Sequence, residues 1–344
     1  MNPVMFCRNT SGIRRWEHSS TKCAPLVALC ENMRIKWCSQ GDYTTWTPSA
    51  TNTANIRTVT EGTKLVGGVV LGDQISLIWS DTALYVHQYN GSSIVFETRL
   101  IGKNCGLISP NAKVSASGMA FWAGHKTLFM YDGTVRQIPN VEDIRTYIFD
   151  LIDPLAGYLA AAMYSPPFNE VWFFFVEQGS LEPGRYVILS LTDYSLMVGT
   201  LNRVGGAYFQ HGDVRPYWCD ENGQIFIHEN GYDADGVAMD AYITLAPYSL
   251  EGGRRLISVE AIEADIFEQS GSVTYTLRAY DRIRKATDAP MSEEEFSIGE
   301  DDTDPMIEFR TRARYVGMTV RSNTLGGNFE FGTPVAWIQG GGGK

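Results

Sequence analysis

Turn residues recur about every eight to twelve positions along most of this chain, and short apolar runs fill the intervals. Between residues 34 and 139 no helical pattern separates these runs, so we expect strands that follow one another in antiparallel meanders. Ile75–Ser80 and Leu84–Tyr89 form one predicted hairpin, and Gly118–Trp122 and Thr127–Tyr131 form a second. This spacing predicts an all-β fold.

Two later groups of strands each have the size of a propeller blade, which is four antiparallel strands in about 40–50 residues. The first group covers residues 157–201, and the second covers residues 206–245. The run VWFFFV at 171–176 is apolar on both faces, as expected for a strand between neighbouring blades. Aromatic residues make up 12% of the chain, and 34 residues are glycine. We therefore predict a β-propeller of about five to seven blades.

One segment departs from the strand pattern. Residues 141–152 (VEDIRTYIFDLI) carry apolar side chains at helical spacing, which predicts a short helix with Asn140 as its N-cap and Pro154 beyond its end. Within the predicted strand 64–71, Gly67-Gly68 indicates a bulge or a close approach of the backbone to another segment.

The predicted boundaries divide the chain into four parts. Residues 1–33 form an N-terminal arm or a closing strand, and residues 34–252 hold the propeller blades. Residues 253–339 form closing blades or a small β-sandwich, beginning with a hairpin between 256–267 and 272–280. A charged, irregular stretch follows at 281–304. Residues 340–344 form a flexible glycine tail.

Composition limits the classes of function. The chain has 344 residues, 44% of them hydrophobic, which is enough for a substantial core. Its 28 basic and 39 acidic residues give a net charge of −11, which argues against DNA binding over the general surface. No run of eighteen apolar residues predicts a membrane anchor, and the N-terminus lacks the apolar region of a signal peptide. We expect synthesis in the cytoplasm.

The six cysteines, Cys7, Cys23, Cys30, Cys38, Cys105 and Cys219, include no C-x-x-C pair. A zinc site with His18 and three of the first four would need ligand pairs two to four residues apart, which the sequence lacks. We expect reduced cysteines that pack as small apolar residues, with no metal and no cofactor.

The sequence offers no catalytic constellation. It contains no G-x-S-x-G elbow, no P-loop and no dinucleotide-binding fingerprint, and its five histidines lie apart. His87 alternates with Tyr85 and Tyr89 on one strand face, which favours a packed or surface role. Paired carboxylates for glycoside hydrolysis depend on a separation in space, so a host-surface propeller that binds or cleaves glycans remains the alternative to a protein without enzymatic activity.

Two charged groups stand out as candidate sites. The acidic group is predicted to be a solvated loop, and it consists of Glu293, Glu294, Glu295, Glu300, Asp301, Asp302 and Asp304. The basic group is predicted to lie along one strand face, and it consists of Arg310, Arg312 and Arg314, with Arg321 nearby. Three interpretations of the arginines stay open, namely a solvated face paired with the acids, a subunit interface and a phosphate contact.

Four motifs between residues 37 and 139 resemble a known family. WCSQGDYTTWTPSATNTA, LIWSDTALYV, IGKNCGLISPNAKV and AFWAGHKTLFMYDGTVRQIP are similar to the β-propeller tail accessory, nozzle or packaged-DNA-stabilisation proteins of short-tailed bacteriophages. The resemblance extends over residues 34–340. Gln40 departs from it, because the family has an acidic residue after the first tryptophan motif.

The resemblance implies a structural protein of the virion tail, assembled in the host cytoplasm. It implies a ring of subunits, expected to number six, attached below the portal or its adaptor and in contact with tail fibres, spikes or a needle. Genomic DNA would pass through the ring without sequence-specific binding. If the acidic loop faced that channel, its like charge would keep DNA from adhering to the wall.

Overall fold

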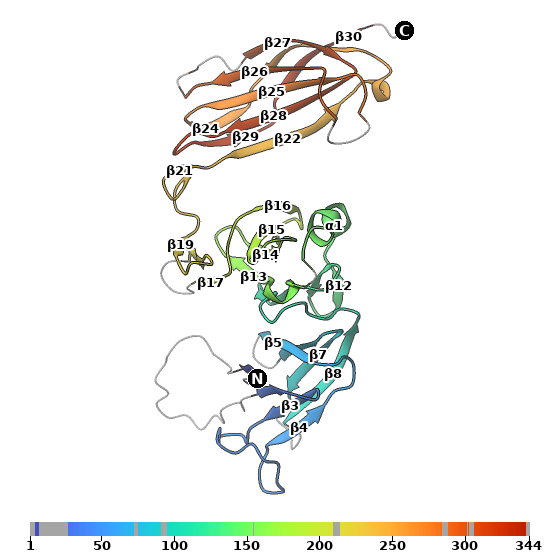
Figure 1. Cartoon of the computed structure of the whole chain (residues 1–344), viewed down its shortest axis with the longest axis vertical. Helices are drawn as coiled ribbons and strands as arrows, with labels where there is room; N and C mark the ends of the chain where they lie inside the picture. Colours follow the sequence, from blue (N-terminus) through green and yellow to red (C-terminus); the bar gives the residue numbers. More distant parts are fainter. Residues whose placement is uncertain are drawn as a thin grey trace. The chain divides into compact units, whose positions relative to one another are not determined.

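The computed structural model describes residues 27–71, 75–90, 95–153, 155–208, 214–283, 288–300, 302 and 306–341, together with the backbone of 4–6 (Figure 1). The chain divides into two compact units, Met1–Glu229 and Asn230–Lys344. Strands dominate both units, and α1 (Val141–Phe149) is the only α-helix in the described part of the chain.

Consecutive antiparallel sheets form the described part of the N-terminal unit, and each strand pairs with its neighbours in the sequence. Every sheet is therefore a meander, as a propeller blade is. The first two sheets consist of β1 (Val4–Phe6), β2 (Val27–Cys30), β3 (Arg34–Trp37) and β4 (Asn55–Thr58), then β5 (Leu65–Leu71), β6 (Ile75–Ser80), β7 (Ala83–Tyr89) and β8 (Phe96–Lys103).

The next two sheets flank the helix in the sequence. They consist of β9 (Lys113–Ala116), β10 (Met119–Ala123), β11 (Leu128–Tyr131) and β12 (Val135–Gln137), then β13 (Ala161–Ser165), β14 (Glu170–Val176), β15 (Pro183–Ser190) and β16 (Leu196–Thr200). A three-stranded sheet follows, with β17 (Gly205–Tyr208), β18 (Pro216–Cys219) and β19 (Ile225–Ile227). The short 3₁₀ helix η1 (Gly157–Leu159) precedes β13.

The first strands of consecutive sheets contact one another, in the order β1, β5, β9, β13 and β17. The sheets of a propeller are arranged around a central axis, which brings one strand of each blade close to its counterpart in the next. The predicted fold class is confirmed: the chain is all-β, the sheets of its N-terminal unit have blade topology, and the described residues also form one short α-helix and a C-terminal sandwich.

A β-sandwich forms most of the C-terminal unit (Figure 1). One sheet consists, in spatial order, of β22 (Ala241–Tyr248), β28 (Tyr315–Ser322), β25 (Val273–Tyr280) and β26 (Ser292–Ile298). The facing sheet consists of β27 (Met306–Ala313), β23 (Ile257–Glu263) and β30 (Val335–Gly340), and β24 (Ile266–Ser270) pairs with β29 (Asn328–Phe331) beside them. Alternate apolar residues of β25, such as Tyr275 and Leu277, share one core with Ile257 and Val259 of β23. Of the two predicted possibilities for this region, closing blades or a sandwich, the sandwich is the one found.

The same unit also contains β20 (Asp233–Ala234), β21 (Val237–Ala238) and η2 (Glu251–Gly253).

Several predicted boundaries are wrong because pairing in the sandwich is not local. β22 was expected to complete a blade within 34–252, but it pairs with β28, and the units divide at Glu229. The predicted hairpin between 256–267 and 272–280 does not form, because β23 pairs with β27 and β30 while β25 pairs with β26 and β28. Between β23 and β25 the chain forms β24, which pairs with β29.

The predictions for the two ends of the chain also need correction. β2 lies within the predicted arm 1–33, yet it pairs with the adjacent β3 in the first sheet. Gly340, expected in a flexible tail, is the last residue of β30, and residues 342–344 lie outside the described part.

The predicted helix is shorter than expected. It ends at Phe149, because Ile152 already forms a β-bridge with Glu177, and Asn140 makes no side-chain cap. Pro154 also lies outside the described residues.

The bulge predicted at Gly67-Gly68 is confirmed in β5, since the register between β5 and β6 shifts between Leu65 and Gly67.

His87 is completely buried in a separate aromatic cluster of the N-terminal unit. Its ring stacks on Phe96 at 4.3 Å and lies 5.5 Å from Trp37. Its Nδ1 atom is 2.8 Å from the Thr98 hydroxyl, and its Nε2 atom has no hydrogen-bond partner among the described residues. Burial lowers the pKa of His87 to about 4. The histidine is therefore held neutral within the core.

Stability should consequently fall as the pH drops from 6.5 towards 4. The unfolded chain takes up the His87 proton near pH 6.5, whereas the folded chain takes it up near pH 4. The loss amounts to about 3 kcal/mol when complete. The variant His87→Phe should lose less stability over this range, as measured by urea unfolding at each pH. His228 keeps a contribution of the same sign in both proteins, and identical pH slopes would contradict the assignment to His87.

Candidate functional site

A polar cavity lies where the first strands of three consecutive sheets approach one another. Its volume is about 320 Å³. The residues before and at the start of β9, the start of β13 and the start of β17 supply its wall, and they are Pro110, Asn111, Lys113, Ala161, Ala162, Met163, Val204, Gly205 and Gly206. We call this cavity the first-strand pocket. Most of its wall is backbone and small side chains, so Lys113 supplies its only charge among the described residues.

Local turn geometry places the lysine. The Ala112 N–H donates to the Ser109 carbonyl at 3.0 Å, which closes a turn directly before β9. The Ala162 N–H donates to the Asn111 carbonyl at 2.8 Å and ties this turn to β13. The Lys113 ammonium donates to the Pro110 carbonyl, and no carboxylate of the described residues forms an ion pair with it. Burial lowers the pKa of Lys113 to about 8.

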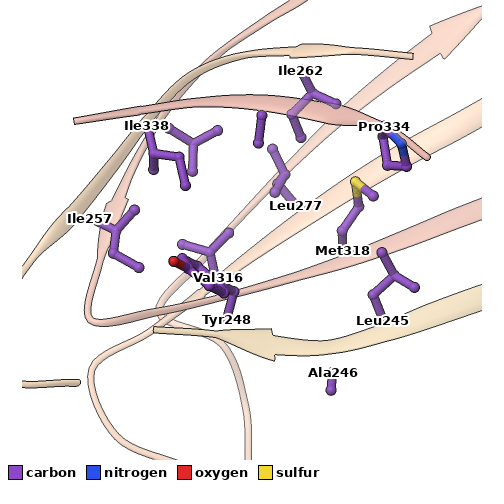
Figure 2. A pocket seen from close by; sticks show the side chains of 12 residues that line it. Leu245, Ala246, Tyr248, Ile257, Ile262, Leu277, Val316, Met318, Pro334 and Ile338 are labelled. Carbon is purple, nitrogen blue, oxygen red and sulfur yellow. The ribbon is translucent and has the colours of Figure 1, made fainter. Parts of the chain in front are cut away.

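A second cavity lies between the two layers of the sandwich (Figure 2). It has a volume of about 370 Å³, and its wall is almost entirely apolar. The labelled side chains in Figure 2 come from both sheets, with Leu245 and Tyr248 on β22 and Ile338 on β30. β22 and β30 are edge strands of their sheets, so the cavity lies along one open side of the sandwich.

The opposite side of the sandwich is closed. There β26 contacts β27, and the Glu294 carboxylate of β26 accepts a 3.1 Å hydrogen bond from the backbone N–H of Arg310 on β27. Charged side chains line both of these edge strands. In contrast, β22 and β30 contain no charged residue, and every residue of β30 is exposed. The two sides of the sandwich therefore differ in both closure and charge.

The four predicted arginines do not form one cluster. Arg310 and Arg312 alternate on the exposed face of β27, as predicted. Arg314 lies beyond β27, where its Nε donates to Asp281 at 3.1 Å and its Nη1 to the carbonyl of Gly253 at 3.0 Å. Arg321 lies on β28 in the other layer and binds both Asp240 oxygens, at 2.6 and 2.7 Å.

The prediction that the acidic group forms a loop is wrong for its first three residues. Glu293, Glu294 and Glu295 lie on strand β26, which pairs with β25 along its whole length. Alternation along the strand gives the three glutamates different partners. Glu293 accepts from Arg278 at 2.8 Å and Glu295 from Thr276 at 3.4 Å, while Glu294 points to the opposite face. These side-chain pairs make an acidic run compatible with an edge strand.

The other described residues of the acidic group accept hydrogen bonds from backbone N–H groups. Glu300 accepts from the Gly271 N–H at 3.3 Å, and Asp302 accepts from the Gly299 N–H at 2.6 Å. Asp301 and Asp304 lie outside the described residues. Within the part of the chain that the structure describes, no three His, Cys, Asp or Glu side chains gather as a metal site.

One carboxylate pair has raised pKa values. Burial raises the pKa of Glu170 and that of Glu229, and the nearby Glu170 charge raises the pKa of Glu229 further. The Trp172 indole N–H donates to Glu170 at 3.0 Å. Sequence spacing gave no sign of this pair, because Glu170 begins β14 whereas Glu229 follows β19 of the next sheet. The first-strand pocket was missed for the same reason.

Comparison with known proteins gives little similarity. No family model matches this chain, and no curated protein matches it. Among solved structures, BamB from Moraxella catarrhalis is similar with a TM-score of 0.30 and 10% sequence identity, over 61% of this chain and 69% of BamB. A TM-score this low carries no conclusion about function. No helix among the described residues has the length and apolar character needed to span a bilayer.

Proposed function

We propose that this protein is a structural subunit of the tail of a short-tailed bacteriophage, and that it assembles into a ring below the portal or its adaptor. The motifs between residues 37 and 139 support the family, and the open side of the sandwich supports assembly. The expected ring has six subunits, contacts tail fibres, spikes or a needle, and conducts and retains genomic DNA. The net charge of −11 supports passage of DNA without adhesion.

The observation that carries assembly is the uncharged edge strand β30. Edge strands expose backbone N–H and C=O groups that can pair with another chain, and proteins usually protect them with charge or proline. β30 has neither, whereas β26 and β27 on the closed side carry charges. β22 is less suited to continuous pairing, because Pro247 lacks an N–H donor.

The occupant that we propose is a strand from a second copy of this chain. An added strand would satisfy the free edge of β30 through main-chain hydrogen bonds. Its alternate apolar side chains would enter the cavity lined by Leu245, Tyr248 and Ile338. Because the edge is uncharged, an apolar strand fits it better than a charged one. Repetition of this contact around an axis would close a ring.

The test is the mass of the protein in solution, measured by light scattering over a concentration series, with and without the portal or adaptor complex. We expect rings in at least one of these conditions. Ile338→Lys should abolish them, because it places a charge at the mouth of the apolar cavity. Phe296→Lys is the matched control, since Phe296 is 44% and Ile338 40% exposed and both lie on edge strands.

The possible outcomes separate the two parts of this proposal. A wild-type protein that stays monomeric in every condition would contradict the ring. If Ile338→Lys forms rings as readily as the wild type, the proposal of a ring stands and the proposed contact at β30 is excluded. Thermal unfolding of each variant shows whether it is folded.

A propeller that binds or cleaves host glycans is the second candidate, and the Glu170–Glu229 pair favours it. Two carboxylates with different environments are the usual catalytic groups of glycosidases, and a raised pKa suits the general acid. If the protein is a monomer, glycan hydrolysis should be measured with the wild type and with Glu170→Gln. Equal rates would exclude this pair as the catalytic one.

A further inference from the structure

The lysine of the first-strand pocket has fewer partners than its charge requires. An ammonium group has three donors, and the Lys113 group uses one of them on the Pro110 carbonyl. Lys113 is partly exposed, and the part of its charge that is removed from water costs free energy unless an opposite charge or hydrogen bonds compensate for it. Among the described residues no carboxylate lines the pocket. The described residues of the pocket therefore place no negative charge opposite the ammonium group.

The backbone around the lysine is shaped to make room for it. A Cβ atom on Gly67 would lie 3.2 Å from the Lys113 Nζ atom and 3.4 Å from its Cε atom. The absence of a side chain at Gly67 on β5 thus allows the ammonium group to lie against that strand. Asn111 also lines the pocket. Its volume of about 320 Å³ exceeds that of several water molecules.

We propose that the first-strand pocket binds a small oxyanion, either a phosphate group or a carboxylate group. The Lys113 ammonium supplies the opposite charge, and the Asn111 amide supplies a neutral hydrogen-bond donor. A charge-assisted hydrogen bond from an ammonium to an oxyanion is stronger than one between neutral groups. Both ligand groups fit this chemistry. The inference concerns the N-terminal unit and does not depend on ring formation.

The experiment measures the melting temperature of the full chain against increasing sodium phosphate, sodium acetate and sodium chloride at matched ionic strength. Three proteins are compared, namely wild type, Lys113→Met and Lys126→Met. Lys126 is exposed in the turn between β10 and β11, and it does not line the pocket, so its variant matches the change in charge. A ligand that binds only the folded state raises the melting temperature in a saturable manner.

We expect phosphate or acetate to produce a saturable increase in wild type and in Lys126→Met, and no such increase in Lys113→Met. An effect of phosphate alone identifies a phosphate site, and an effect of acetate identifies a site that accepts carboxylates. No saturable increase in wild type with either anion would overturn the proposal. Equal increases in all three proteins would also overturn it.

A second measurement avoids the need for the Lys113→Met variant to fold. Acetic anhydride labels lysine amines of the wild-type protein, and mass spectrometry reports the rate at each site. Phosphate or acetate at ten times its half-saturating concentration should slow labelling of Lys113 about tenfold, because only the unoccupied pocket reacts. Labelling of Lys126 should not change. Unchanged labelling of Lys113 with both anions would overturn the site.

Discussion

Trp122→Ala is expected to lower the free energy of unfolding of the N-terminal unit by about 3–5 kcal/mol. Trp122 is completely buried in the largest core of that unit. Its ring lies 5.3 Å from Trp79 in an edge contact and stacks on Phe129 at 5.5 Å. Its indole N–H donates to the Cys105 carbonyl at 2.8 Å. Truncation would leave a cavity and also an unsatisfied carbonyl.

Urea unfolding followed by circular dichroism measures this loss. Tyr43→Ala is the control, because Tyr43 is an aromatic residue of the same unit whose side chain is 72% exposed. We expect the control to change the free energy of unfolding by less than about 1 kcal/mol. Equal losses in the two variants would show that burial of Trp122 does not dominate the stability of this core.

Gly106→Ala is expected to destabilise the same unit by about 3 kcal/mol or more, because the new atom meets backbone and not a mobile side chain. A Cβ atom on Gly106 would lie 2.0 Å from the carbonyl oxygen of Asp81 and 2.5 Å from the Thr82 nitrogen. The segment around Gly106 is held in this position on both sides. The Cys105 N–H donates to Thr82 at 3.1 Å and the Leu107 N–H to Ser80 at 3.2 Å.

Gly184→Ala provides the matched control for this substitution. Gly184 lies on β15 of the same unit, and a Cβ atom there would have no neighbour within 4 Å. We expect no loss of stability in this variant. If thermal unfolding gives the same midpoint for Gly106→Ala as for wild type, the close approach of the two segments must be absent in solution.

The contact around Gly106 gives the sequence motifs a physical basis. Asp81 belongs to LIWSDTALYV, and Gly106 belongs to IGKNCGLISPNAKV. The Asp81 carboxylate accepts from the Thr63 N–H at 2.8 Å, which fixes the turn against which Gly106 packs. These motif residues therefore hold one sheet against the next. The contact between Asp81 and Gly106 thus contributes to the fold of the N-terminal unit.

Sequence reasoning predicted several of the sheets whose strands pair with their neighbours in the chain, although the first sheet was placed partly in a terminal arm. The hairpin of β6 and β7 and the four-stranded sheet β13–β16 were both predicted, because a turn of a few residues determines such pairs. The same reasoning failed for β22, β23 and β25. Their partners lie far along the chain, and a turn signal does not reveal whether the chain continues in the same layer of a sandwich.

The candidate sites were predicted less well for a related reason. The alternation of Arg310 and Arg312 was visible in the sequence, but Arg321 belongs to the other layer and binds Asp240. Lys113 resembled an ordinary solvated lysine, since its surroundings come from β5, β13 and β17. The uncharged sequence of β30 was a usable signal, because an exposed edge strand without charge indicates pairing with another chain.

The order of strand pairing has a consequence for synthesis of the protein. Each sheet of the N-terminal unit uses strands that are adjacent in sequence, so it can form soon after its own residues leave the ribosome. β22 must wait, because Thr244 pairs with Thr319, which is 75 positions later. A nascent chain that stops before β28 therefore carries β22 without its partner. Such truncated chains would keep an ordered N-terminal unit and lack the sandwich.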